Sequence, residues 1–283
     1  MKTVNSISGG QTSAYIASNY PADYNIFSLI RSNDKDVMFP DKKLRQVVSD
    51  KIGTEFIGTL EDDKIIYTIL DLEQFIGREI TWLTGETFED VISSRKMKNG
   101  GFFLPNQQMR YCTSDMKLTP IKEWWYKEVK EPVDMRIGFR ANEQRRAKRM
   151  IEKYNDNGLH VDSFITGKRG QNNKWEDIEW RKASFPLIQD AIFKDRIVEY
   201  WKDKPVRFAD YNNCIMCFHR SPMFLNKIAQ DHLNKAEWFA KQEERAGSRF
   251  KKEVSMREII DFNTQHELTF DDFSSCEGGY YGI

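Results

Sequence analysis

The chain has 283 residues, and its 43 lysines and arginines are balanced by 43 aspartates and glutamates. This zero net charge excludes a protein held to nucleic acid or to membranes by a global positive field, so any such binding has to be local. The hydrophobic share of 40% suffices for a globular core, and no apolar run approaches the roughly 20 residues of a membrane-spanning helix. Because the N-terminus lacks the apolar core of a signal peptide, we expect a cytoplasmic protein with reduced cysteines.

The first elements in the chain predict a βαβ unit. Thr3–Ile7 is a short β-branched run, and two glycines separate it from the helix-compatible residues 12–20, which Pro21 terminates. A second apolar run follows at residues 24–30. Strand, tight turn, helix and strand in this order predict a parallel sheet.

The remaining segments alternate in type. We expect helices at residues 42–52, 88–96, 118–129 and 142–154, strands at 79–83 and 133–139, and either type at 64–72. Polar, turn-rich segments at 155–158 and 167–173 bracket a hairpin or a loop. Further helices are expected at 190–201, 222–233 and 236–246. The predicted fold is α/β, a mainly parallel sheet flanked by helices, with a domain at 1–183 and a helical C-terminal extension at 184–283 that packs over the strand ends.

The turn Ser8-Gly9-Gly10-Gln11-Thr12-Ser13 lies where the first strand leads into the first helix. Glycines permit close backbone approach, and the first N–H groups of a helix attract anions, so this turn predicts a phosphate site. The hydroxyls of Ser8, Thr12 and Ser13 add donors, and one of them could cap the helix. A capped turn without a ligand is the alternative. The chain lacks G-x-x-x-x-G-K-[ST], and no G-x-G-x-x-G follows this strand, which argues against a Walker ATPase and an ordinary dinucleotide fold.

A basic block follows the strand expected at 133–139. It contains Arg140, Arg145, Arg146, Lys148 and Arg149 against the single acid Glu143. Ligands of open α/β sheets bind at the carboxyl ends of strands, so Arg140 is placed to bind a phosphate. Arg146 lies three residues after Glu143 and can pair with it on one helical face. The other cations form either a solvated helix face or local contacts to nucleic-acid phosphates.

The cysteines predict a metal centre. Cys214 and Cys217 have the C-x-x-C spacing, and Cys112 and Cys276 supply two further thiols. Four thiolates suit tetrahedral zinc or a four-iron four-sulfur cluster, with His219 as a substitute for Cys276. The alternative is a redox pair at Cys214 and Cys217, with the other two cysteines as small buried apolar residues.

The Ser8-to-Ser13 turn resembles the pyrophosphate-binding loop of the PP-loop superfamily, the adenine nucleotide α-hydrolase fold. The commoner form of this loop has Asp at the position of Thr12. The form with Thr resembles the phosphoadenosine phosphosulfate (PAPS) reductase-like proteins that phages often encode. Residues 104–121, 137–146 and 185–217 are similar to the R-x-C-T…K…P, G-[IF]-R-x-x-E-x-x-R and PL…C-x-x-C blocks of these proteins. The resemblance covers about residues 1–220.

The resemblance implies an enzyme that binds ATP or an adenosine phosphosulfate, with Mg²⁺ accompanying ATP. It would act at the α-phosphate, releasing pyrophosphate from an adenylated intermediate before sulfur or amine transfer. Ser8, Ser13 and Arg140 would be catalytic, and the nucleotide would be held by Ser8, Gly9, Gly10, Gln11, Thr12, Ser13, Gly138, Arg140 and Arg146. Analogy with sulfur-handling relatives favours iron–sulfur over zinc at Cys112, Cys214, Cys217 and Cys276.

Two other functions stay open on the same fold. One is a sulfite-forming PAPS reductase, although Cys276-Glu277-Gly278 reverses the Glu-Cys-Gly order of its nucleophile segment. The other is a non-catalytic nucleotide-binding or nucleic-acid-binding protein. The expected partners are an adenine nucleotide, a tRNA or DNA acceptor and a sulfur donor protein, in the host cytoplasm if a phage encodes the chain.

Overall fold

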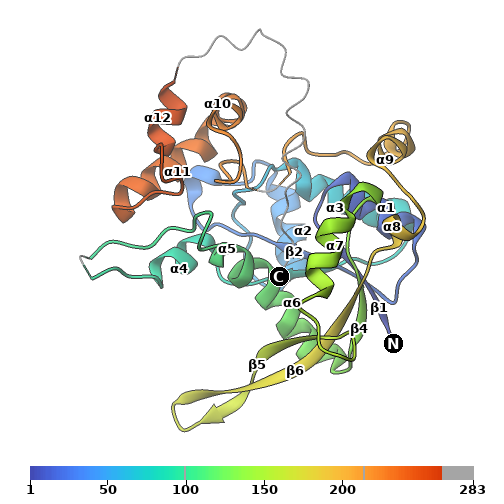
Figure 1. Cartoon of the computed structure of the whole chain (residues 1–283). Coiled ribbons are helices and arrows are strands. Elements are labelled where there is room, and N and C mark those ends of the chain that lie inside the picture. The colour runs from blue at the N-terminus through green and yellow to red at the C-terminus, as the bar shows by residue number, and fades with distance from the viewer. Residues whose placement is uncertain (99, 213, 263–283) are drawn as a thin grey trace.

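The computed structural model describes residues 1–98, 100–212 and 214–262. Its centre is a six-stranded sheet with the order β3-β2-β1-β4-β6-β5 (Figure 1). The strands are β1 (Thr3–Ile7), β2 (Tyr24–Leu29), β3 (Thr81–Thr84), β4 (Val133–Arg136), β5 (His160–Arg169) and β6 (Asn172–Ser184). All neighbours pair in parallel except β5 and β6, which are antiparallel. The predicted α/β class with a mainly parallel sheet is confirmed.

Helices connect the strands and follow them. The α-helices are α1 (Gln11–Asn19), α2 (Lys42–Ile52), α3 (Lys64–Ile76), α4 (Phe88–Ser93), α5 (Tyr111–Thr113), α6 (Thr119–Trp124), α7 (Gln144–Ile151), α8 (Pro186–Gln189), α9 (Lys194–Trp201), α10 (Pro222–Asp231), α11 (Leu233–Ala246) and α12 (Met256–Asp261). Shorter helical turns are η1 (Lys35–Val37), η2 (Ser114–Leu118), η3 (Trp125–Val129) and η4 (Ala141–Glu143). The undecided segment 64–72 is therefore helical. None of the described helices is both long and apolar enough to span a membrane.

Both faces of the sheet are covered, because successive strand residues point to opposite sides. Ile7 and Phe27 lie in a core with buried residues of α1, α3 and α9. Val4 and Ile26 lie in a second core with buried residues of α6, η3 and α7. The near-continuous apolar character of β2 follows from burial on both faces.

The part of the chain after β6 does not pack as one unit. Helix α9 joins the core of α1, where the indole Nε1 of Trp201 donates to the Gln11 carbonyl at 3.0 Å. Helices α10, α11 and α12 instead form a third core with α4 and with Met116. The division of the chain at residue 183 stays a prediction, as does the role of the last helices as an extension over the sheet.

Candidate functional site

The sheet order places the carboxyl ends of β1 and β4 side by side at a switch point of the sheet. These two strands are neighbours, and β1 pairs on its other side with β2, so the connections after β1 and β4 diverge. Open α/β sheets bind ligands at such a switch point. The Ser8-to-Ser13 turn follows β1, and the loop carrying Gly138 and Arg140 follows β4. Two segments predicted separately as nucleotide-binding therefore end at the same edge.

The turn after β1 is closed by the hydroxyl of Ser13. This hydroxyl accepts from the Ser8 N–H at 3.1 Å and donates to the Gly10 carbonyl at 3.0 Å, and it lies 3.2 Å from the Ser8 hydroxyl. Gly10 is the N-cap of α1, and none of the side chains that the structure describes caps this helix end. The suggestion that a hydroxyl of the turn caps the helix is therefore wrong, since Ser13 bonds within the turn. The helix start is left free of a side-chain acceptor.

The two glycines of the turn meet different neighbours. Gly9 has a φ of +80°, and a β-carbon there would lie 2.7 Å from Cγ2 of Ile65 in α3. A β-carbon on Gly10 would lie 3.5 Å from the Asn212 side-chain amide. Gly9 is thus required by backbone conformation and by packing, whereas the space beside Gly10 admits a methyl group.

The loop after β4 touches the glycine turn. A β-carbon on Gly138 would lie 3.4 Å from Cγ2 of Thr12 and 3.9 Å from the backbone nitrogen of Ser13. The absence of a side chain at Gly138 therefore lets the loop approach the first turn of α1. The fold brings together two sequence blocks that are far apart in the chain.

Arg140 and Arg146 share the carboxylate of Glu143. The backbone N–H and Nε of Arg140 donate to Oε2 of Glu143 at 2.9 and 3.1 Å, and Arg146 pairs with Oε1. The predicted Arg146–Glu143 pair is confirmed. Arg146 also lies over the Phe139 ring, 4.4 Å from its centre. Arg140 is buried and held in place, while Arg145, Lys148 and Arg149 are exposed.

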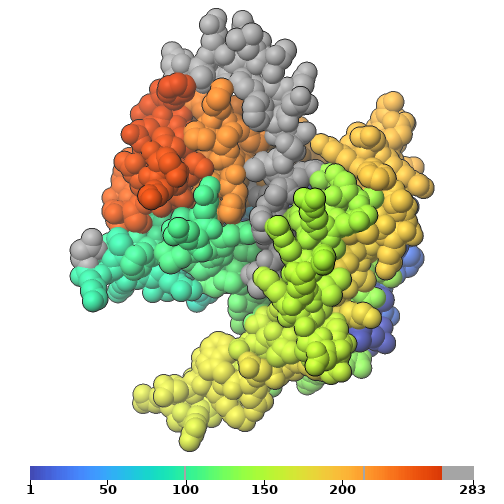
Figure 2. All heavy atoms as spheres, viewed as in Figure 1, coloured from blue at the N-terminus to red at the C-terminus, as the bar shows by residue number. Residues whose placement is uncertain are grey.

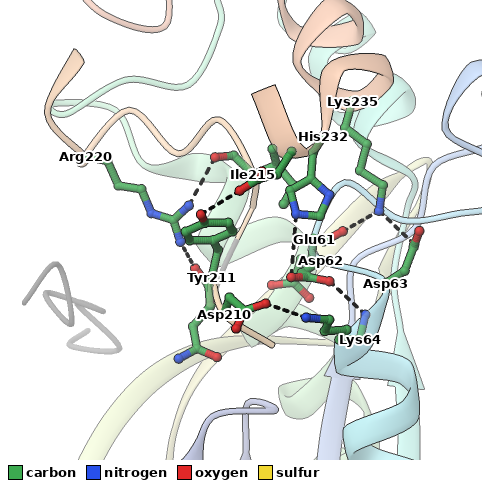
Figure 3. A network of polar contacts seen from close by, with 12 residues as sticks. Glu61, Asp62, Asp63, Lys64, Asp210, Tyr211, Ile215, Arg220, His232 and Lys235 are labelled. Carbon is green, nitrogen blue, oxygen red and sulfur yellow. Dashed lines mark hydrogen bonds and ion pairs between the residues drawn. The ribbon is translucent and has the colours of Figure 1, made fainter. Parts of the chain in front are cut away.

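An acidic segment beside the turn was not predicted as part of the site. Residues 61–63 directly precede α3, which begins at Lys64 (Figure 3). Ile65 in the first turn of α3 packs on Gly9. Asp62 is only 2% exposed, and its Oδ1 accepts from the Lys64 N–H at 2.9 Å. Its Oδ2 has no hydrogen-bond donor among the described residues and lies 3.7 Å from Nε2 of His232. Lys64 pairs with Asp210, two residues before Asn212.

Lysines compensate the charges next to Asp62. The ammonium of Lys235 donates to the Glu61 carbonyl at 2.6 Å and to Oδ1 of Asp63 at 2.7 Å (Figure 3). Burial raises the pKa of Asp63, and Lys235 opposes this rise. The side chain of Glu61 pairs with Lys117 at 2.9 Å. Among the described residues, Asp62 is therefore the carboxylate of this segment that forms no ion pair with a lysine.

The described thiols gather near Glu61 and Lys117. Burial, and then the neighbouring Cys217, raises the pKa of Cys112 to about 11. Burial, followed by Glu61, raises the pKa of Cys214, which bridges Glu61 in a short antiparallel contact. Within the described ranges, no group of three or more His, Cys, Asp or Glu side chains is arranged to hold a metal. Cys276 lies outside the described residues, so the four-cysteine centre stays a prediction.

Comparison of the chain with protein-family models, with curated proteins and with solved structures gives no match.

Proposed function

We propose that this protein is an adenine-nucleotide-dependent enzyme of the PAPS reductase-like PP-loop group, which binds ATP or a related adenosine phosphate and acts at its α-phosphate. One observation carries the proposal. Gly138 lies against Thr12, so the block containing Arg140 and the glycine turn meet at the switch point of the sheet, where open α/β sheets have their ligand crevice. An uncapped helix start and a buried arginine are groups that bind phosphate.

The residues of the crevice have separate tasks in this proposal. The Ser8 hydroxyl and the N–H groups at the start of α1, that of Ser13 among them, donate to the phosphate oxygens, and Arg140 adds positive charge. The Ser13 hydroxyl holds the turn in shape through its bond to the Gly10 carbonyl. An acceptor atom attacks the α-phosphorus, and the bond to the bridging oxygen breaks as pyrophosphate leaves. A sulfur or amine nucleophile then displaces AMP from the acceptor. The turn accelerates the first step because its fixed donors stabilise the charge that develops on the leaving pyrophosphate.

Magnesium fits the acidic segment. Asp62 offers a buried carboxylate oxygen without a hydrogen-bond donor in the described structure, and carboxylate oxygens are the protein ligands that Mg²⁺ prefers. Asp62 would hold the ion, and the ion would neutralise phosphate charge. In this proposal Asp62 supplies the carboxylate that Thr12 cannot supply from within the turn.

An iron–sulfur cluster or zinc ion at Cys112, Cys214, Cys217 and Cys276 is kept as a second part of the proposal. The three described thiols influence each other's charge but do not form a ready ligand set. No catalytic step is derived from this centre.

The turn is tested with Gly10→Val. Valine at this position keeps an ordinary backbone conformation, and its β-carbon is in van der Waals contact with the side-chain amide of Asn212, so the fold survives while the approach of phosphate is blocked. Calorimetric titration with ATP should show at least a tenfold loss of affinity. Gly167→Val is the matched control, because nothing lies within 4 Å of a β-carbon there.

Pyrophosphate release from ATP separates the proposed reaction from its alternatives. A PAPS reductase would instead form sulfite from PAPS with thioredoxin, and a binding protein would release neither product. Unchanged ATP affinity of Gly10→Val would show that the turn holds no nucleotide and would overturn the proposal.

A further inference from the structure

The hairpin of β5 and β6 projects from the body of the protein (Figures 1 and 2). Its strands pair from His160 to Arg169 and are joined through Gly170, whose φ of +67° suits a tight turn. Phe164 and Trp180 anchor the base in the core of the sheet. The distal part has no core of its own, so stability alone does not explain its length.

The outer face of the hairpin exposes a tryptophan. Trp175 is 59% exposed and pairs across the strands with Ile165, which is 46% exposed. Tryptophan is on average a highly buried residue, so this exposure points to a binding role. An irregularity in the register between Ile165 and Gly167 places Lys168, which pairs with Asn173, on the same face as Trp175.

The distal hairpin carries positive charge. From the pair of Ser163 and Asp177 outward, residues 163–177 contain the cations Lys168, Arg169 and Lys174 and the acids Glu176 and Asp177, an excess of one positive charge. Only Lys174 is neutralised, by Glu176 at 2.5 Å; Lys168 and Arg169 form no ion pair with any residue that the structure describes. Two acids nearer the base accept hydrogen bonds from neutral side chains. Ser163 donates to Asp177 at 2.6 Å, and Asn157 donates to Glu179 at 3.3 Å.

We propose that this hairpin binds a single-stranded segment of nucleic acid. Trp175 offers a flat surface on which a base stacks, and Lys168 on the same face contacts a neighbouring phosphate. Arg169 pairs with Asn172 and so lies on the opposite face, where it adds positive charge beside the turn. An unpaired strand fits better than a duplex, because stacking requires a base with a free face. It fits better than a protein, because the exposed apolar side chains of Trp175 and Ile165 form one small pair bordered by cations and amides rather than a large continuous patch.

Helix α7 extends the basic surface toward the candidate nucleotide crevice. It begins just after Arg140 and exposes Arg145, Lys148 and Arg149. Tyr154, which follows α7, contacts the ring of His160 at the base of the hairpin, with 5.3 Å between ring centres. A strand held at the hairpin could therefore follow α7 to the crevice. The inference goes beyond the proposed function, since nucleic-acid binding by the hairpin does not require ATP.

The test is fluorescence anisotropy without ATP, using labelled oligonucleotides of about 20 nucleotides, long enough to cover one binding site. Single-stranded RNA, single-stranded DNA of the same sequence and the DNA duplex are compared. We expect both single strands to bind more tightly than the duplex. The single strand with the higher affinity shows whether the hairpin prefers ribose or deoxyribose.

Two variants and two controls locate the surface. Trp175→Ala should weaken binding about tenfold, as expected for the loss of one stacked base. The double variant with Lys168→Glu and Arg169→Glu should lower the slope of log Kd against log salt concentration by at least about 0.7, the value for the phosphate contact of Lys168. Lys42→Glu with Lys43→Glu makes the same charge change on exposed residues of α2, and Phe193→Ala removes another exposed ring; both should bind as the wild type.

Several results would overturn the proposal. They are a wild type that binds no oligonucleotide at low salt, a duplex bound as tightly as the single strands, or hairpin variants that bind as the controls do. Circular dichroism and urea unfolding of each variant establish that the fold is intact. ATP titration of the same variants tests the nucleotide site separately. A failure of the hairpin to bind nucleic acid therefore leaves the proposed nucleotide site unaffected.

Discussion

Gly138 packs against Thr12, with 3.4 Å between the position of a β-carbon on Gly138 and Cγ2 of Thr12. This contact fixes how closely the loop after β4 approaches the first turn of α1. Arg140 is carried on that loop, so the contact also sets the distance between its guanidinium and the glycine turn. A steric change at either residue should therefore alter anion binding.

Gly138→Val is expected to weaken ATP binding at least tenfold, because its two added methyl groups push α1 away from the loop. A fold change of ten corresponds to ~1.4 kcal/mol. Thr12→Ser removes the methyl group that is struck and keeps the hydroxyl, so the double variant should recover part of the affinity. Calorimetric titration of both single variants and the double variant measures the effect. Additive losses would show that the two residues do not act through this contact.

Parts of this site can be predicted from the sequence because they depend on local rules. A β-branched run before two glycines and a helix defines the turn, and a strand before Gly138 places that loop at the same edge of a parallel sheet. Asp62 could not be predicted, because three acids before a helix usually form its solvated start. Its burial results from packing by α11, which supplies Lys235 from far along the chain.

The end of β4 shows a second limit of the sequence. Residues 133–139 are apolar enough to predict one strand, but β4 ends at Arg136. Arg136 reaches across β1 and donates to the Tyr20 carbonyl at 2.7 Å, and the pairing with β1 stops at this residue. Such a strand end depends on the neighbouring strand. Trp175 is a similar case, since β-propensity predicts its strand but not which face stays uncovered.

Asp62→Asn should separate magnesium binding from nucleotide binding. The amide oxygen can still accept from the Lys64 N–H, so the start of α3 stays intact, while the negative charge is lost. We expect ATP affinity without magnesium to be kept or improved, and the gain on adding magnesium to fall about tenfold, or ~1.4 kcal/mol. Asp50→Asn, at an exposed position of α2, is the control. An equal magnesium response in Asp62→Asn and the wild type would exclude Asp62 as a ligand.

His160 should make the protein less stable in mild acid. Its Nδ1 accepts from the Trp180 indole at 3.2 Å, which requires the neutral ring, and burial followed by the charge of Arg181 lowers its pKa to about 4. The unfolded chain takes up this proton below its ordinary pKa of about 6.5, whereas the folded protein does so only near 4. Stability is therefore complete above about pH 6.5 and decreases as the pH falls toward 4.

Urea unfolding at pH 7 and pH 5 measures this effect, which should be about 2 kcal/mol for His160 alone. His160→Gln cannot titrate in this range, so the difference between the two pH values should shrink by about that amount. Burial also lowers the pKa of His219 to about 4, so His219 contributes to the pH dependence in the same direction. His219→Gln removes this contribution separately. A His160→Gln variant with the full pH dependence of the wild type would contradict the assignment.

The cysteines allow a last prediction that distinguishes a metal centre from independent thiols. Thiols must lose their protons to bind metal. Burial raises the pKa of both Cys112 and Cys214, so without a metal these thiols stay protonated and react slowly. If they are ligands, anaerobically purified protein contains iron or zinc, and Cys112→Ser, Cys214→Ser or Cys217→Ser each removes most of it. Elemental analysis with visible absorption measures the loss and separates an iron–sulfur cluster, which is coloured, from zinc. Cys276→Ser and His219→Ala then identify the fourth ligand, since only the variant of the true ligand loses metal. Wild-type protein free of both metals, with three thiols that react independently with a thiol reagent, would rule out the centre.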